Sequence, residues 1–217
     1  MSNSYVNKQS DDYQLTAACW HESAHTICGL HNFMKVYRVH VRSNEEEHGR
    51  THYELYDSEV ISNKLLLKIL LIYEVQTLYA GLVGERMYYK DICGSDAFPM
   101  HLRIGSSDDI KHAALIISKY NLAVPGKNRS LFKKQIQRDV KDILMHYWSD
   151  VRLIAHCLYK FKDLNFKDLR FYLTHKSDNQ EFWKQRFKDI KTLYANNMKL
   201  DEKYLKDVLL CNAVFVF

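Results

Sequence analysis

The residues best placed to do chemistry are two histidines four positions apart, His21 and His25, with Glu22 directly after the first. On an α-helix, residues i and i+4 lie one turn apart on the same face, so both imidazoles can reach one metal ion. Glu22 lies about 100° round the helix from His21, where it cannot be a ligand but can reach a water on that ion. The stretch therefore predicts two zinc ligands and a general base, which is the signature of zinc hydrolases.

A motif this short also arises by chance, and the alternative is a pair of buried histidines that bond to neighbouring carbonyls. The flanking residues are apolar or small and include no proline, which indicates a buried helix that ends at a glycine stop near Gly29. Titratable groups inside a buried helix need partners, and a metal ion is one such partner. The context therefore favours the metal site.

Glu85 is an acidic residue on the apolar face of a second predicted helix, which we expect from Ser58 to about Tyr89. A buried carboxylate is costly unless it is paired. Glu85 can orient a ligand histidine, act as a ligand itself, or form an ion pair at the helix edge, for example with Arg86. Gly81 and Gly84 lie on the same helix and indicate close approach of another backbone.

Asp109 is a second acid that helical phase turns inward. Ser106 and Asp109 have the spacing of a capping box at the start of a helix that runs to Tyr120. Within this helix Asp109 shares a face with apolar residues, whereas Asp108 shares one with polar residues. Asp109 is then either a third metal ligand or a plain capping acid.

The composition is that of an ordinary globular protein: of 217 residues, 47% are hydrophobic and 26% are charged. The net charge of +5 comes from lysines spread along the chain, so we expect no nucleic-acid partner. Five cysteines without a CxxC pair indicate reduced thiols and a cytoplasmic location. The most apolar run, 65–83, includes Lys68 and Glu74, which favours a core helix over a membrane span.

The remaining pattern predicts a mainly α protein with a small β-hairpin, an α+β class. Residues 35–42 and 50–55 alternate apolar and polar side chains, as the strands of a hairpin do. The edge of that hairpin either pairs with an extended peptide substrate or only covers the core. Further helices are expected over residues 131–161, 166–173, 179–196 and 201–210.

Four stretches together resemble the peptidase domain of FtsH-type ATP-dependent zinc metalloproteases, and the resemblance covers about residues 13–173. They are similar to the family's HEAGHA helix, its strand and turn, its small-residue helix with an acid pair, and its TGASND segment. The corresponding residues are 21–26 with Gly29, 36–41 with 49–51, 79–85, and 104–109. Two positions depart from the pattern, because Ala24 replaces a glycine and Arg86 replaces the second acid of the pair.

This resemblance implies a helical metallopeptidase domain in which zinc is held by His21, His25 and Asp109. It also implies that Glu22 is the general base and that Glu85 is an acid behind the ligands. The expected function is zinc-dependent hydrolysis of peptide bonds in unfolded proteins or peptides. The chain has no P-loop, so a separate ATPase or further copies of the chain are the partners to consider beside the polypeptide substrate.

We expect three regions along the chain, which are a polar lead, the metallopeptidase domain and a helical extension with an apolar tail. Their bounds are 1–12, 13–173 and 174–217. The tail, residues 213–217, either packs on the body or docks on a partner.

Two alternatives remain open at this stage. His31 stands ten residues after His21, which is the spacing of the third histidine in metzincin-type motifs, although Cys28 occupies the position of that motif's glycine. The chain can also be a catalytically inactive relative of the peptidases that serves as a binding or regulatory module. The complete set of candidate site residues speaks against this second alternative.

Overall fold

The computed structural model describes residues 3–42, 49–54, 61, 63–94, 106–123 and 129–195, with side chains from Gln14 onward except at 92, 93 and 195. The elements are α1 (Asn3–His31), β1 (Lys35–Val41), β2 (Gly49–Glu54), α2 (Lys64–Cys93), α3 (Ser106–Lys119), α4 (Arg129–His146), α5 (Trp148–Phe161), β3 (Asp163–Asn165), α6 (Phe166–His175) and α7 (Gln180–Ala195). The predicted class is confirmed, because the protein is mainly helical with a small antiparallel sheet. The predicted helix over 201–210, the tail 213–217 and the cap at Ser58 lie outside the described residues.

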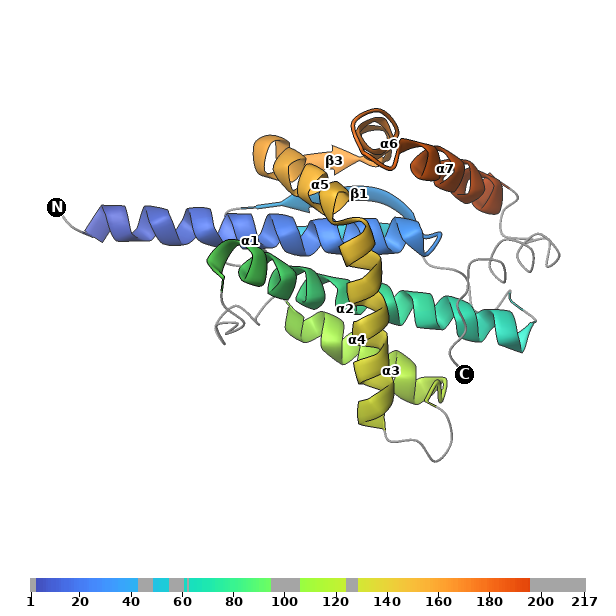
Figure 1. Cartoon of the computed structure of the whole chain (residues 1–217). Helices are drawn as coiled ribbons and strands as arrows, with labels where there is room; N and C mark the ends of the chain where they lie inside the picture. The colour runs from blue at the N-terminus through green and yellow to red at the C-terminus, as the bar shows by residue number, and fades with distance from the viewer. Residues whose placement is uncertain are drawn as a thin grey trace.

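The two longest helices, α1 and α2, run side by side in opposite directions through the centre of the molecule (Figure 1). Their contact is tight because glycines of α2 face α1. A Cβ at Gly84 would overlap the Cβ of Ala24, and a Cβ at Gly81 would overlap the rings of His21 and His25. The predicted close approach at these two glycines is therefore confirmed, and it brings α2 directly against the histidine motif.

By length and composition, α2 is the one helix among the described residues that is apolar enough to cross a membrane, over Lys64–Asp91. Within the protein, however, 72% of the most apolar 18-residue stretch of this helix is buried. Leu70, Val75 and Leu78, for example, lie in the interior. Such burial is what we expect of the core helix that the sequence predicts.

The sheet has the strand order β2-β1-β3, and all of its pairs are antiparallel. The predicted hairpin is confirmed as β1 and β2, with Val41 opposite Gly49 and Lys35 opposite Glu54. Val36 and Val39 are buried against α1, so the sheet covers one side of the motif helix. The third strand, β3, is short and was not expected from the sequence.

Helix α1 begins earlier than expected, near Asn3, and ends within one residue of the expected end at Leu30 but without the expected glycine stop. It begins at Asn3 instead of near Tyr13, because the predicted polar lead has no glycine or proline to stop a helix. It also continues past Gly29 to His31, so the predicted glycine stop is wrong. The chain turns instead at Phe33, which has a positive φ of 62° and closes a Schellman-type end in which the Met34 amide donates to the Gly29 carbonyl.

The long helix expected over 131–161 is two helices, α4 and α5, which meet at Tyr147. Tyr147 is buried, and its ring packs against those of Phe182 and Trp183 on α7. Trp183 in turn donates from Nε1 to the buried carboxylate of Asp150 at 2.9 Å. Packing against α7 therefore accounts for the break, and α7 belongs to the same core as the helices before it.

Candidate metal centre

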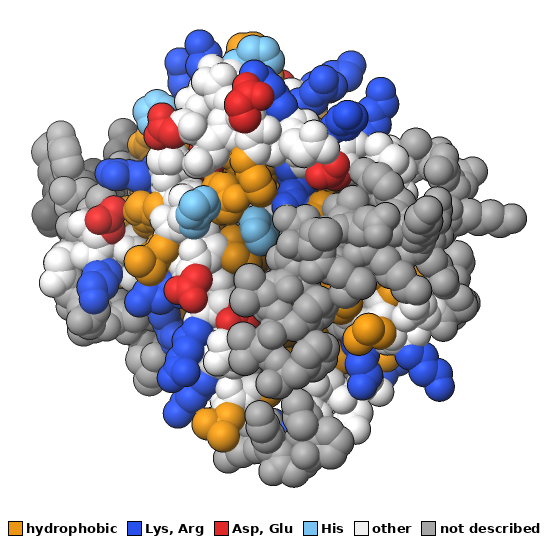
Figure 2. Space-filling view, turned by 45° about the vertical axis from the view of Figure 1, so that its right-hand side comes forward, with side chains coloured by type: hydrophobic (Ala, Val, Ile, Leu, Met, Phe, Trp, Pro, Cys, Tyr) orange, Lys and Arg blue, Asp and Glu red, His pale blue; other side chains and the backbone are white. Residues whose placement is uncertain are grey.

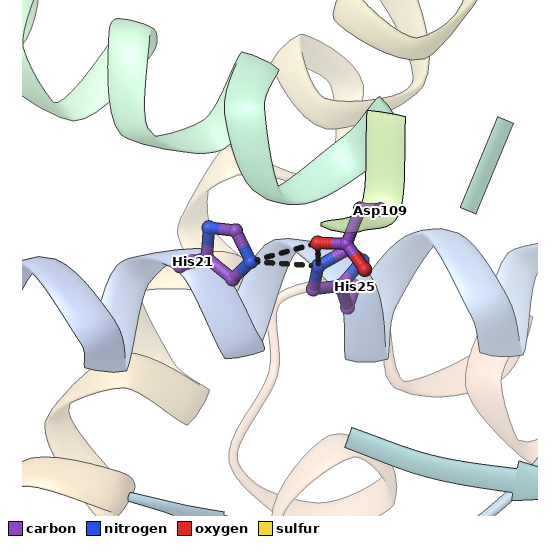
Figure 3. A group of neighbouring side chains, drawn as sticks. All are labelled: His21, His25 and Asp109. Atoms are coloured by element: carbon purple, nitrogen blue, oxygen red, sulfur yellow. Dashed lines mark hydrogen bonds and ion pairs between the residues drawn. The ribbon is translucent and has the colours of Figure 1, made fainter. Parts of the chain in front are cut away.

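His21, His25 and Asp109 converge at one point between α1 and the first turn of α3 (Figure 3). The two imidazole Nε2 atoms are 2.9 Å apart, and Asp109 Oδ2 lies 3.3 Å from His21 Nε2 and 3.2 Å from His25 Nε2. A circle through these atoms has a radius of about 1.8 Å, so an ion with bonds of about 2.0–2.1 Å reaches all three from about 1 Å outside their plane. The three donors therefore fit one divalent cation.

The other ring nitrogen of each imidazole, Nδ1, donates a hydrogen bond to an acceptor on α2. His25 Nδ1 lies 2.7 Å from the carbonyl oxygen of Thr77 on α2, and a carbonyl only accepts, so Nδ1 carries the hydrogen. His21 Nδ1 lies 2.5 Å from Glu85 Oε1, also on α2, and donates to that carboxylate. In the neutral imidazoles both Nε2 atoms then carry lone pairs that face the cluster, which is the tautomer that metal-binding histidines need.

Two lone pairs and a carboxylate oxygen thus meet with no hydrogen-bond donor between them, in the interior, where His21 is 6% and His25 is 5% exposed. Such an arrangement is repulsive unless a cation, either a proton or a metal ion, lies at its centre. Burial alone lowers the pKa of His21, but its hydrogen bonds to Asp109 and Glu85 and the charges of Glu85 and Glu22 outweigh burial and raise that pKa. The site therefore has a strong affinity for positive charge.

Asp109 is ionised under the same influences. Burial raises the pKa of its carboxyl group, but the charge of His25 and the hydrogen bonds that both imidazoles donate when they are protonated lower it well below the usual range. An ionised carboxylate is the form that binds a metal ion. The inward orientation predicted from helical phase is confirmed, because the side chain of Asp109 is 27% exposed and that of Asp108 is 91% exposed.

The predicted capping box at the start of α3 is wrong. Ser106 Oγ is buried and has no hydrogen-bond partner among the described residues, so it does not cap the helix. The Asp109 carboxylate turns toward the histidines. Of the two interpretations left open for Asp109, the geometry favours the ligand.

Glu85 adopts one of the three arrangements that the sequence left open, the contact with His21. It is buried, and its Oε1 holds His21 Nδ1, while Arg86 beside it points outward and is exposed. The second oxygen, Oε2, is buried and has no hydrogen-bond partner among the described residues. Glu85 therefore fixes the orientation of the His21 ring and does not belong to the group of three converging donor atoms.

Glu22 lies next to the cluster and is held from the sheet. Thr51 Oγ1 on β2 donates to Glu22 Oε2 at 2.7 Å and lies 3.1 Å from the Glu22 backbone carbonyl. Gly49, also on β2, leaves room for this side chain, because a Cβ there would stand 2.7 Å from Glu22 Cγ. Glu22 is 5% exposed, so its side chain is held in the interior by Thr51.

His31 is not part of this centre. Its ring packs on Tyr147 and Phe182 with centroids 5.6 Å and 6.1 Å away, and its Nδ1 pairs with Asn32 Oδ1. Burial, together with the charge of Arg186, lowers the pKa of His31 from 6.5 to about 4. The metzincin-type alternative is therefore not supported by the geometry.

Two partners of the site were missed in the sequence. The pattern around Thr51 indicates only a strand and a turn, and nothing in it points to Glu22. The Thr77 carbonyl is a backbone group that every residue has, so the residue type at position 77 does not indicate this hydrogen bond either. Gly81 was the available clue, because only a residue without a side chain lets both rings reach the α2 backbone.

No family model matches the chain, and no curated protein matches it in sequence. What the chain does must therefore be inferred from the chemistry of its own residues.

Proposed function

We propose that this chain is a zinc-dependent metalloendopeptidase, similar to the peptidase domain of FtsH-type proteases, that hydrolyses unfolded polypeptides. The observation that carries the proposal is the convergence of two imidazole lone pairs and an ionised carboxylate beside a buried glutamate. His21 and His25 supply the nitrogen ligands, and Asp109 supplies the oxygen ligand.

The donor set supports zinc over Mg²⁺ and Ca²⁺. Imidazole nitrogen is a common ligand of zinc, whereas Mg²⁺ and Ca²⁺ prefer sites made of oxygen atoms. Three protein ligands leave a fourth position of the tetrahedron free, which is the pattern of catalytic zinc sites. Cys19 and Cys28 are poor competitors, because burial raises the pKa of each thiol to about 12 and keeps it protonated.

Zinc in such a site supplies Lewis acidity and activates water for attack on a peptide carbonyl. The protein's own contribution is to place a base and to orient the ligands. Glu22 accepts the proton of the attacking water and passes it to the leaving amine, and Thr51 keeps one carboxylate oxygen of Glu22 in position. Glu85 and the Thr77 carbonyl keep the two imidazoles in the metal-binding tautomer.

The sheet supports a polypeptide substrate. β2 is the outer strand of the order β2-β1-β3, so one of its sides pairs with β1 and the other has no strand partner among the described residues. An extended peptide that pairs with that side lies along the strand that carries Thr51, the partner of Glu22. The cytoplasmic location and a separate ATPase or homo-oligomer as partner belong to the same proposal.

The test is to measure zinc content and cleavage separately. Purified protein should bind one zinc ion per chain and cleave unfolded casein. Asp109→Asn should lose the zinc, whereas Asp108→Asn, a matched change one residue away on the exposed face, should keep it. Glu22→Gln should keep the zinc and lower the cleavage rate at least about 100-fold.

The contrary result is equally clear. Zinc-loaded protein that cleaves neither casein nor unfolded peptides, with no difference on Glu22→Gln, would contradict the peptidase proposal. That outcome would favour the inactive binding or regulatory module.

A further inference from the structure

A groove with a volume of about 890 Å³ lies between α6 and α7, and it is not part of the metal centre. Its apolar lining consists of Phe166, Phe171, Phe187, Ile190 and Tyr194. Its charged lining is entirely cationic and consists of Lys35, Lys167, Arg170, Lys184, Lys188 and Lys191. None of the described lining residues is acidic.

Most of these cations have no counter-charge among the residues that the structure describes. Lys35 pairs with Glu54 at 2.9 Å, and Lys184 pairs with Glu181 at 2.5 Å. The other four lining cations make no ion pair with any residue that the structure describes; they are Lys167, Arg170, Lys188 and Lys191. Four like charges around one groove repel each other, and an anionic ligand relieves that repulsion.

The cations are arranged in two rows along the helices. Lys184, Lys188 and Lys191 have the i, i+4, i+7 spacing that places side chains on one face of α7. Lys167 and Arg170 have the i, i+3 spacing on α6. Figure 2 shows Lys and Arg side chains gathered at the top of the molecule, the end at which α6 and α7 lie in Figure 1.

We propose that this groove binds an acidic, amphipathic peptide segment of another protein. An apolar floor bordered by two cationic rows is complementary to a helix that has one apolar stripe with acidic residues on both sides of it. The exposed ring of Phe171, which is 49% accessible, provides a contact for that apolar stripe. The inference is independent of the metal centre and holds whether or not the chain is a peptidase.

Two other anionic ligands fit the groove less well. A lipid bilayer is flat or convex on this scale, so it does not reach the apolar floor of a groove. Single-stranded nucleic acid binds by stacking bases on exposed aromatic faces. Here His175 covers one face of the Phe171 ring, with centroids 5.0 Å apart at 22°, and Phe166 contacts the ring of Phe187 edge-on at 5.4 Å, so these three phenylalanines do not present a row of free ring faces.

The experiment measures binding of a designed peptide to the full chain by fluorescence anisotropy. The probe is a labelled helix-forming peptide of about 14 residues, about 21 Å long, with leucines on one stripe and glutamates on both sides of it. We expect saturable binding that weakens as the salt concentration rises. A peptide of the same composition in scrambled order, which has no apolar stripe, should bind at least about tenfold more weakly.

Charge reversal in the protein locates the binding. Lys188→Glu combined with Lys191→Glu should weaken binding at least about tenfold, and Phe171→Ser should weaken it as well. Lys134→Glu, a single charge reversal at an exposed position on α4 outside the groove, should leave affinity within about twofold. Because all four residues are exposed, circular dichroism should show an unchanged fold in every variant.

The proposal is overturned if the full chain does not bind the peptide. It is also overturned if the scrambled peptide binds equally well, or if Lys134→Glu weakens binding as much as the groove variants do. Tighter binding of phosphatidylserine vesicles or single-stranded DNA, lost in the same double variant, would assign the groove to that ligand instead.

Discussion

Gly81→Ala should abolish zinc binding through a single added methyl group. A Cβ at position 81 would lie 2.5 Å from Nε2 of His21 and 2.5 Å from Nε2 of His25, the two atoms that are to hold the ion. Ordinary contact begins near 3.4 Å, so the rings must retreat by about 1 Å, whereas zinc–ligand distances tolerate about 0.2 Å. We expect zinc affinity to fall at least about 100-fold, or about 3 kcal/mol.

The matched control is Gly84→Ala, which lies on the same helix and packs against the same partner. Its Cβ would overlap the Cβ of Ala24 without touching a histidine. Both variants gain about 1 kcal/mol of helix propensity and lose about 1–3 kcal/mol through overpacking. Their free energies of unfolding should therefore change by similar amounts, while only Gly81→Ala should lose the metal.

The assay is a competitive titration of zinc against a chromogenic chelator, with the free energy of unfolding measured in parallel by urea denaturation. Wild-type zinc affinity in Gly81→Ala would refute the reasoning, because two rings cannot hold the ion and also accommodate the methyl group. Equal loss of zinc in Gly84→Ala would also refute it, since helix packing alone would then explain the effect.

Three further predictions concern the residues around the site and the core. Thr51→Val should keep zinc bound and lower casein cleavage about tenfold, because Glu22 loses the hydrogen bond that holds its carboxylate in position; an unchanged cleavage rate would contradict this. Trp183→Phe should lower the free energy of unfolding in urea by about 1–3 kcal/mol, since the buried Asp150 carboxylate loses a donor; no change would contradict it. Wild-type protein should lose up to about 3 kcal/mol as pH falls from 6.5 to 4, because the unfolded chain protonates His31 first, and His31→Leu should lose less.

The arrangement of the candidate site was largely predictable from the sequence because it depends on helical periodicity. The spacing of His21 and His25 sets their common face, and the phase of α3 turns Asp109 inward and Asp108 outward. Gly81 and Gly84 marked the helix contact because a glycine inside a helix costs stability and needs a reason. Each of these indications depends on residues within one helix, so it can be interpreted without knowledge of the fold.

The turns of the chain were less readable, because residues with side chains take positions where glycine is usual. Phe33 ends α1 and Lys162 ends α5, both with positive φ, and neither residue type signals such a turn. Phe33 is held there by tertiary contact, with the Arg186 guanidinium 3.5 Å from its ring centroid. The turn at Lys162 leads directly into β3, so a sequence that does not indicate the turn does not indicate the strand either.

The hydrogen bond between Thr51 and Glu22 also lay beyond sequence analysis. It joins residues 29 positions apart on different elements, and it depends on how the sheet lies on α1. The break at Tyr147 is of the same kind, because the apolar stripe continues through it and only packing against α7 redirects the chain. Tertiary contacts outweigh local propensity at both places.

X-ray absorption spectroscopy of the zinc-loaded protein tests the metal centre most directly. The geometry of His21, His25 and Asp109 predicts two imidazoles and oxygen ligands at about 2.0–2.1 Å, with no sulfur. In Asp109→Asn the same spectrum should be lost together with the zinc. A zinc ion bound through cysteine sulfur at about 2.3 Å, or bound equally well without the Asp109 carboxylate, would contradict the account.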